Sequence, residues 1–312
     1  MPTPTEAHLR YRPWRGTLRP PAYAAVAIAR SSLKLLFRRK LFWALYALAL
    51  LLFFFYFYCL FLIVWLKQQL AERTMNLLGG TVRVSTIFDW LEGLGLSGSA
   101  YTFANFFWIE GYIAMIVLAL AGAVLVGNDF HHGSLAYYLS KPIGRRHYVL
   151  GKVLGVGGFV NLMTTVPAVV LFVEAGLLND WRTWYFDHPR LLLGAIGYGA
   201  VLTVVLGLLL VATAVVVRRT VPLVMIWTAV FVLTRIVGEL LAEVFENPWW
   251  RLLDLWNDLY LIGLWLLGAE FVPARIGGQQ PPVWAAVCVA VGVCVGSVLL
   301  LRRRIRAVEV VS

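Results

Sequence analysis

The sequence has 312 residues, of which 61% are hydrophobic and 14% are charged, and its mean hydropathy is +0.78. A water-soluble domain cannot bury so much apolar surface, so the composition excludes a soluble protein and indicates an integral membrane protein. The formal net charge of +11 is not a nucleic-acid signal, because the basic residues are concentrated in a few short segments.

The N-terminal part of the chain is basic. Residues 1–22 are rich in proline and arginine and are expected to form a cytosolic lead. In the next segment, 23–40, Arg30, Lys34 and Arg38 recur at every fourth position. An apolar stripe runs beside these cations and consists of Val26, Ala29, Leu33 and Leu36. The pattern predicts an amphipathic interfacial helix that lies on the inner leaflet with its cations on anionic lipid. A basic anchor that only fixes the orientation of the chain would have the same pattern.

Six later stretches are apolar over the roughly 20 residues that a helix needs to cross the hydrocarbon of a bilayer. None of them alternates between apolar and polar residues, which argues against a transmembrane β-barrel. Lipid offers no hydrogen-bond partner to the backbone, so these stretches are expected to be helices. The predicted spans are 41–66, 104–127, 153–178, 191–217, 221–242 and 283–301.

The distribution of charge predicts the topology. Segments 1–40, 128–152, 218–220 and 302–312 hold 19 of the 27 basic residues and only three acids. The remaining loops, 67–103, 179–190 and 243–282, hold seven basic residues and ten acids. Because positively charged loops stay in the cytosol, we expect both termini inside a multi-pass protein of the cell inner (plasma) membrane. An even number of spans agrees with this topology.

Segment 247–270 is apolar enough to suggest a seventh span, but Arg251, Asp254 and Asp258 interrupt it. A seventh span would also move the arginine-rich C-terminal tail outside. The segment is instead predicted to form one or two short amphipathic helices that dip into the outer leaflet. The two carboxylates would lie on one face of the second helix, and leucines would lie on the other.

The loop between spans two and three, residues 128–152, carries a motif. Its elements are Asp129, Gly133-Ser134-Leu135, Leu139-Ser140-Lys141-Pro142-Ile143, Arg145, Tyr148 and Gly151-Lys152. This series resembles the permease subunits of type-2 ABC transporters, which are mostly exporters, except that Gly144 replaces a usual hydroxyl residue. Together with the six-span layout, the resemblance covers nearly the whole chain from residue 23.

The resemblance implies an all-α, six-span, type-2 ABC exporter permease fold and a single transmembrane domain over 23–312. It also implies that two permease copies, identical or homologous, pair with two soluble ATPase subunits that bind ATP and Mg. The substrate path in this family involves spans two and five. The ATPase-coupling residues that carry over are Asp129, Phe130, Gly133, Ser134, Leu135, Tyr138, Lys141, Pro142, Arg145, Arg146, Tyr148, Gly151 and Lys152.

The residues of the loop suit such a contact. Glycine and proline divide it into a short helix and a turn, so that Phe130, Leu135 and Tyr138 can fill a groove on a partner. Lys141 and the arginines that follow can then meet an acidic rim. A positively charged inner loop without a partner is the alternative interpretation.

The chain itself has no phosphate-binding loop, because Gly151-Lys152 is followed by Val153 and lacks the leading glycine. We therefore expect no catalytic residues and no cofactor bound by this chain. The three cysteines, Cys59, Cys288 and Cys294, lie inside predicted spans and do not have the spacing of a metal site. No metal site and no nucleic-acid partner is predicted.

Four ionisable residues, Glu110, Glu174, Arg235 and Glu239, fall within the predicted spans, where charges are costly and often functional. The topology places all four in the outer half of the membrane. Arg235 and Glu239 are four residues apart and can pair along one helix face. Two hypotheses stay open: a polar outer chamber that takes part in substrate passage, or an internal ion-pair cluster that locks span five to its neighbours.

Two pairs of glycines, Gly151 with Gly155 and Gly292 with Gly296, are spaced to let helices approach closely. We expect both pairs to serve packing within one protomer. Pro167 is expected to kink span three, because its ring removes one helical hydrogen bond.

The sequence thus predicts the membrane-spanning permease subunit of an ATP-driven transporter that exports an amphipathic or lipid-like substrate. The alternative is a stand-alone ion-coupled carrier or a structural membrane protein. A carrier should show midplane charges or broken helices in repeated halves, and the sequence shows neither clearly.

Overall fold

The fold is helical and membrane-spanning. The computed structural model describes residues 22–70, 74–77, 80–83, 96, 98–122, 125, 144–217, 219–269 and 278–304. These residues form six helical segments that are long and apolar enough to cross a membrane, as predicted. The segments are Lys40–Trp65, Ala100–Leu120, Arg145–Leu178, Pro189–Val217, Thr220–Val244 and Val283–Arg304. The chain is therefore a multi-pass integral membrane protein.

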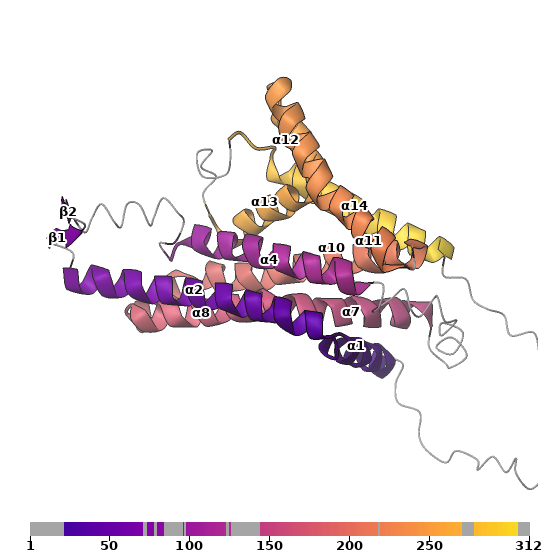
Figure 1. The fold of residues 1–312 in the computed structure, drawn as a ribbon, viewed down its shortest axis with the longest axis horizontal. Coiled ribbons are helices and arrows are strands. Elements are labelled where there is room, and N and C mark those ends of the chain that lie inside the picture. The colour runs from indigo at the N-terminus through magenta and orange to yellow at the C-terminus, as the bar shows by residue number, and fades with distance from the viewer. Residues whose placement is uncertain are drawn as a thin grey trace, which may run out of the picture.

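The structural elements follow one another as Figure 1 shows. In chain order they are α1 (Ala22–Phe37), α2 (Lys40–Leu70), β1 (Thr74–Leu77), β2 (Gly80–Arg83), α4 (Ala100–Gly122), α7 (Arg145–Met163), α8 (Thr165–Leu178), α9 (Trp181–Asp187), α10 (Pro189–Val217), α11 (Thr220–Thr228), the π-helical turn η3 (Ala229–Leu233), α12 (Thr234–Val244), the 3₁₀ helix η4 (Pro248–Leu253), α13 (Leu255–Leu267) and α14 (Val283–Arg304).

Two of the six spans are composite. The third span consists of α7 and α8, which meet at Thr164, three residues before Pro167. A proline ring clashes with the carbonyl four residues earlier and donates no hydrogen bond, which explains an interruption at this point. The fifth span consists of α11, η3 and α12, and its middle turn is wider than an α-helical turn.

A short hairpin departs from the all-helical prediction within the described part of the chain. Strands β1 and β2 pair antiparallel, with Thr74 opposite Arg83 and Leu77 opposite Gly80. The four-residue strands follow the C-terminal end of α2. Strands this short and polar carry no alternation from which a sequence analysis can predict them.

The centre of the bundle is formed by α4, α7, α8 and α10, whereas α2, α12 and α14 expose much more of their surface. Helix α10 contacts α4, α7, α8, α13 and α14. The span formed by α11, η3 and α12 runs obliquely away from this centre, so α12 stands apart from α2 and α8 (Figure 1). Helix α13 fills the angle between α12 and the central helices.

The described parts of the basic segments lie at one end of the bundle. A groove there is lined by both Arg145, where α7 begins, and Arg302, where α14 ends. A second hollow at this end joins Arg39 and Lys40, between α1 and α2, to Thr220, where α11 begins. We call this the basic end, and the opposite end of the central helices the far end.

Helix α1 packs on α7 through small residues. A Cβ at Gly151 would lie 2.8 Å from the carbonyl oxygen of Ala25, and one at Gly155 would lie 3.3 Å from that of Ala29. The first glycine pair therefore serves close packing within the protomer, as predicted. The buried face of α1 consists of Ala25, Ile28, Ala29, Ser32 and Leu36.

This face differs from the predicted stripe, since Val26 is 56% exposed. Gly151 and Gly155 of α7 let the backbone of α1 approach closely at Ala25 and Ala29, and this close approach selects the buried face. Arg30, Lys34 and Arg38 are exposed, as an interfacial helix requires. The second glycine pair, Gly292 and Gly296 on α14, is not used in the same way, because a Cβ at either position would meet no described atom within 4 Å.

Candidate functional site

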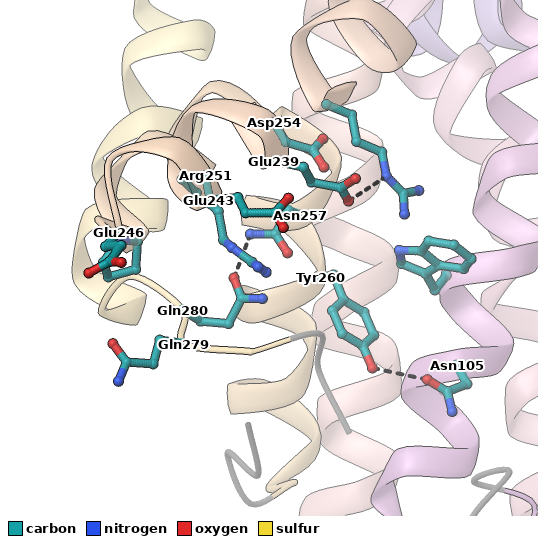
Figure 2. Close-up of a pocket in the computed structure, with 14 residues that line it drawn as sticks. Asn105, Glu239, Glu243, Glu246, Arg251, Asp254, Asn257, Tyr260, Gln279 and Gln280 are labelled. Atoms are coloured by element: carbon teal, nitrogen blue, oxygen red, sulfur yellow. Dashed lines mark hydrogen bonds and ion pairs between the residues drawn. The ribbon is translucent and has the colours of Figure 1, made fainter. Parts of the chain in front are cut away.

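A polar cavity of about 870 Å³ lies between α4, α12, η4 and α13 (Figure 2). Helix α4 contributes residues near its start, and α12 contributes residues from its whole length. The cavity therefore lies remote from Arg145 and the basic end. It is lined by Asn105, Trp108, Arg235, Glu239, Ala242, Glu243, Glu246, Pro248, Arg251, Asp254, Asn257, Tyr260, Gln279 and Gln280.

Arg235 links the two helices that wall the cavity. Its Nη1 donates a 2.8 Å hydrogen bond to the hydroxyl of Tyr112 on α4, and its guanidinium lies 5.3 Å from the ring centroid of Trp108. The two aromatic rings meet edge to face with centroids 4.8 Å apart. A cation over an indole face is attracted by the ring quadrupole, so the aromatic pair both orients the guanidinium and partly shields it.

Arg235 also pairs with Glu239, as the four-residue spacing predicted. Its Nε lies 3.1 Å from Oε1 of the glutamate, and the two side chains are 34% and 54% exposed. An ion pair this accessible contributes about 0–1 kcal/mol to stability. Its geometry therefore suits a contact that can be exchanged for a ligand rather than one that holds the fold together.

The turn between α12 and α13 is built by two capping side chains. Oδ1 of Asn247 accepts a 3.0 Å hydrogen bond from the amide of Trp249, and Oδ1 of Asp254 accepts one of 3.0 Å from the amide of Trp256. These caps satisfy amides at the starts of η4 and α13 that no helix carbonyl can reach. They hold Asp254 at the cavity wall, where burial raises the pKa of its carboxyl above the ordinary value.

Amides and a phenol complete the lining. The hydroxyl of Tyr260 on α13 donates a 3.0 Å hydrogen bond to Oδ1 of Asn105 on α4, and Nδ2 of Asn257 donates one of 3.0 Å to Oε1 of Gln280 (Figure 2). These bonds join α13 to α4 and to the segment that precedes α14. They leave amide and hydroxyl groups along the wall of the cavity.

The cavity carries charges of both signs, with acids in excess. Its two cations are Arg235 and Arg251, and its four acids are Glu239, Glu243, Glu246 and Asp254. Such a lining can bind a polar or charged group by charge-assisted hydrogen bonds, while Trp108 offers an apolar and aromatic surface beside it.

The structure does not bring all four predicted intramembrane charges together. Glu110 is fully buried in α4, and Glu174 is almost fully buried in α8. Their carboxylates have no hydrogen-bond partner among the described residues, and neither residue lines the cavity. A single cluster of these charges that locks span five is therefore not present in the described part of the chain. Only Arg235 and Glu239 meet.

Segment 247–270 also differs from its prediction. Asp254 and Asp258 were expected to share a polar face of an amphipathic helix, but Asp258 is 0% exposed and has no hydrogen-bond partner among the described residues. Most of α13 is buried, because it packs against α4, α10 and α14. Burial and the charge of Asp254 together raise the pKa of Asp258 to about 8.

The predicted ATPase-coupling residues separate into three groups. Arg145 and Arg146 are exposed at the start of α7. Tyr148 and Lys152 are buried, with exposed fractions of 0% and 2%, and Gly151 is packed against α1. Asp129, Phe130, Gly133, Ser134, Leu135, Tyr138, Lys141 and Pro142 lie outside the described residues.

The buried group corrects the prediction that these residues contact a soluble partner. Nζ of Lys152 donates a 2.5 Å hydrogen bond to the carbonyl oxygen of Leu125, beyond the end of α4. An ammonium inside the bundle needs such a partner to offset its lost hydration. The three residues therefore fix the two ends of the loop to each other and to α1.

Several residues of the cavity carry little signal in the sequence. Asn105 and Trp108 lie inside an apolar span, and Glu243 and Glu246 lie in what looks like an ordinary outer loop. An asparagine in a span is a weak pointer to a polar site. Only the fold shows that α12 brings its acids beside α4.

The sequence was also compared with known proteins. No protein-family model matches it, and no curated protein matches it.

Proposed function

We propose that this chain is the membrane-spanning permease subunit of an ATP-binding cassette transporter, and that it exports an amphipathic or lipid-like substrate with ATP hydrolysed by a separate ATPase subunit. The observation that supports the proposal best is the polar cavity between α4 and α12. These are spans two and five, which form the path in the family that the loop motif resembles.

The lining suits a substrate with a charged head and an apolar body. Arg235 can exchange its exposed bond with Glu239 for a phosphate or carboxylate. The carboxylates on α12 can form ion pairs with a protonated amine of the substrate. Trp108 and Tyr112 offer stacking surface, and the oblique course of α12 leaves the cavity beside exposed apolar side chains such as Ile236 and Leu240.

The basic end supplies the proposed coupling. Arg145 and Arg146 are exposed where the motif-bearing loop joins α7. Because Lys152 ties this part of α7 to Leu125, a push on the loop would move α4 and α7 together. Helix α4 reaches the cavity at its other end, so motion of a docked ATPase would be transmitted along it.

The proposed assembly contains a second permease copy. The fifth span presents an exposed apolar stripe at helical spacing, formed by Leu233 at the end of η3 and by Ile236, Leu240 and Val244 on α12. In a dimer that pairs these stripes, the two cavities would face a common path between the protomers. Both termini and the basic end would lie in the cytosol of the cell that carries the protein in its plasma membrane.

Native co-purification tests the proposal. The tagged chain, extracted in mild detergent from its own membranes, is expected to retain a soluble ABC ATPase in a one-to-one ratio. Leu135→Asp, in the loop, should lose this subunit. Phe186→Asp, an exposed apolar residue of α9 at the far end, serves as the matched control and should keep it.

Retention of no ATPase by the unmodified chain, or activity that follows an ion gradient and ignores ATP, would contradict the proposal. The stand-alone carrier would then be the better interpretation. Equal retention by both aspartate variants would also count against the loop as the docking element.

A further inference from the structure

A second groove lies at the basic end, away from the polar cavity. Its volume is about 920 Å³, and its lining comes from α7, α10 and α14. Helices α7 and α14 each pack on α10 but have almost no contact with each other. They therefore form two walls over a floor that α10 provides.

The inner surface of this groove is apolar. Leu150 on α7 and Val204 on α10 are both about half exposed, at 51% and 47%, and Leu208 lies beside them. From Arg145 to Val153 the α7 wall extends about 12 Å along its axis, at roughly 1.5 Å per residue. This length accommodates the part of one acyl chain that is nearest the headgroup.

The rim of the groove at the basic end is cationic. Arg145 and Arg146 begin the α7 wall, and Arg302 ends the α14 wall. All three are exposed, and none forms an ion pair with another residue that the structure describes. Three guanidinium groups around one opening bind a phosphate group well, because each offers two parallel donors to its oxygens.

We propose that this groove binds one anionic phospholipid, with its phosphate between the three arginines and one acyl chain along α10. Charge complementarity identifies the occupant: the apolar part of the groove accepts any acyl chain, but a rim of three arginines favours a net negative headgroup over a zwitterionic one. The proposal does not depend on the proposed transport function, because the groove and the rim exist in the single chain.

Native mass spectrometry of the purified chain tests this site. The probes are dioleoylphosphatidylglycerol and dioleoylphosphatidylcholine, added in equal amounts to delipidated protein. We expect one phosphatidylglycerol to be retained at least fivefold more than phosphatidylcholine. The combined change of Arg145, Arg146 and Arg302 to Gln should abolish this preference. The matched control is Arg303→Gln together with Arg304→Gln, which changes the same helix end outside the groove and should keep it.

A second variant tests the apolar part separately. Val204→Trp should fill the groove and remove the retained lipid whatever its headgroup. Val216→Trp changes a residue of α10 that is 45% exposed but does not line the groove, and it should have no effect. Size-exclusion chromatography checks that each variant remains folded.

Equal retention of the two lipids by the unmodified chain would overturn the proposal. So would a preference for phosphatidylglycerol that survives both the three-arginine change and Val204→Trp. None of these measurements involves an ATPase, so a failure of the lipid site and a failure of the proposed transport function are distinguishable.

Discussion

The indole of Trp256 lies directly against Gly111. A Cβ built on this glycine would approach Cη2 of the indole to 2.5 Å and Cζ2 to 2.7 Å, which is closer than van der Waals contact permits. Trp256 also packs on Tyr112, with ring centroids 5.0 Å apart. Gly111 thus determines how closely α13 approaches α4, and with it the position of the aromatic wall that holds Arg235.

Gly111→Ala is therefore expected to destabilise the protein by about 1–3 kcal/mol, the usual cost of overpacking. Alanine otherwise stabilises a helix relative to glycine by about 1 kcal/mol. The sign of the measured change in stability therefore distinguishes overpacking from helix propensity. Thermal unfolding in detergent measures the change. Gly197→Ala, where the nearest atom to the added Cβ would be 3.8 Å away, is the control and should be neutral or stabilising. Equal behaviour of the two variants would refute the packing argument.

Asp258 makes the stability depend on pH. Its pKa is raised from 3.8 to about 8 in the folded protein, so the folded state holds a proton that the unfolded state has released between these values. Stability is then highest below pH 4 with respect to this group and is lost as the pH rises toward 8. Asp258→Asn removes the dependence and should stabilise the protein at pH 8 by at least about 1 kcal/mol, and by less at pH 5. Thermal unfolding at the two pH values measures this difference, and a benefit that is equal at both would contradict it.

Glu246 lies two residues beyond the end of α12 and has a left-handed conformation, with φ of 48°. The amide of Asn247 reaches back to the carbonyl of Ala242 over 3.1 Å, which is the closing bond of a Schellman motif. Glycine adopts this conformation without steric cost, whereas other residues lose about 1 kcal/mol.

Glu246→Gly is accordingly expected to raise the free energy of unfolding by about 1 kcal/mol, measured by the same thermal assay. Glu246→Ala removes the same charge but keeps a Cβ, so it should not stabilise. A gain of equal size in both variants would assign the effect to charge instead.

Arg235→Leu separates a functional role from a structural one. The exposed ion pair and one hydrogen bond to Tyr112 together contribute less than about 2 kcal/mol. The variant should therefore fold and keep its partners, yet lose ATP-driven movement of a fluorescent phospholipid analogue in proteoliposomes.

The control for this experiment is Arg182→Leu, an exposed arginine on α9 that should change neither property. Loss of folded protein in Arg235→Leu alone would assign the residue to structure. Full retention of phospholipid movement would remove it from the proposed path.

The spans could be predicted from the sequence because each is a long apolar run, and lipid permits only a helix there. The Arg235–Glu239 pair could also be predicted from the sequence, since both residues lie on one helix and the spacing alone determines their contact. Contacts between helices could not be predicted in this way. Nothing local in the sequence shows that Asp258 faces inward or that Lys152 reaches Leu125.

The face that α1 buries illustrates why. Hydrophobicity favours the stripe that includes Val26, but the surface of α7 offers glycines, which accept Ala25 and Ala29 more closely. Packing partners, rather than the apolar pattern of a single helix, decide such cases. The same holds for the cavity, most of whose polar residues come from α4 and from the consecutive elements α12, η4 and α13, which lie far from α4 in the sequence.

The π-helical turn Ala229–Leu233 has a consequence for Arg235, which lies two residues after its end. A π-turn holds one residue more than an α-turn, and one residue of helix corresponds to about 100° of rotation. Were this turn to become α-helical while keeping its extra residue, everything downstream would rotate by about that angle, and the guanidinium would point away from Tyr112. The bond between spans two and five thus exists in one register of span five only, and a slip of a single residue is enough to open it.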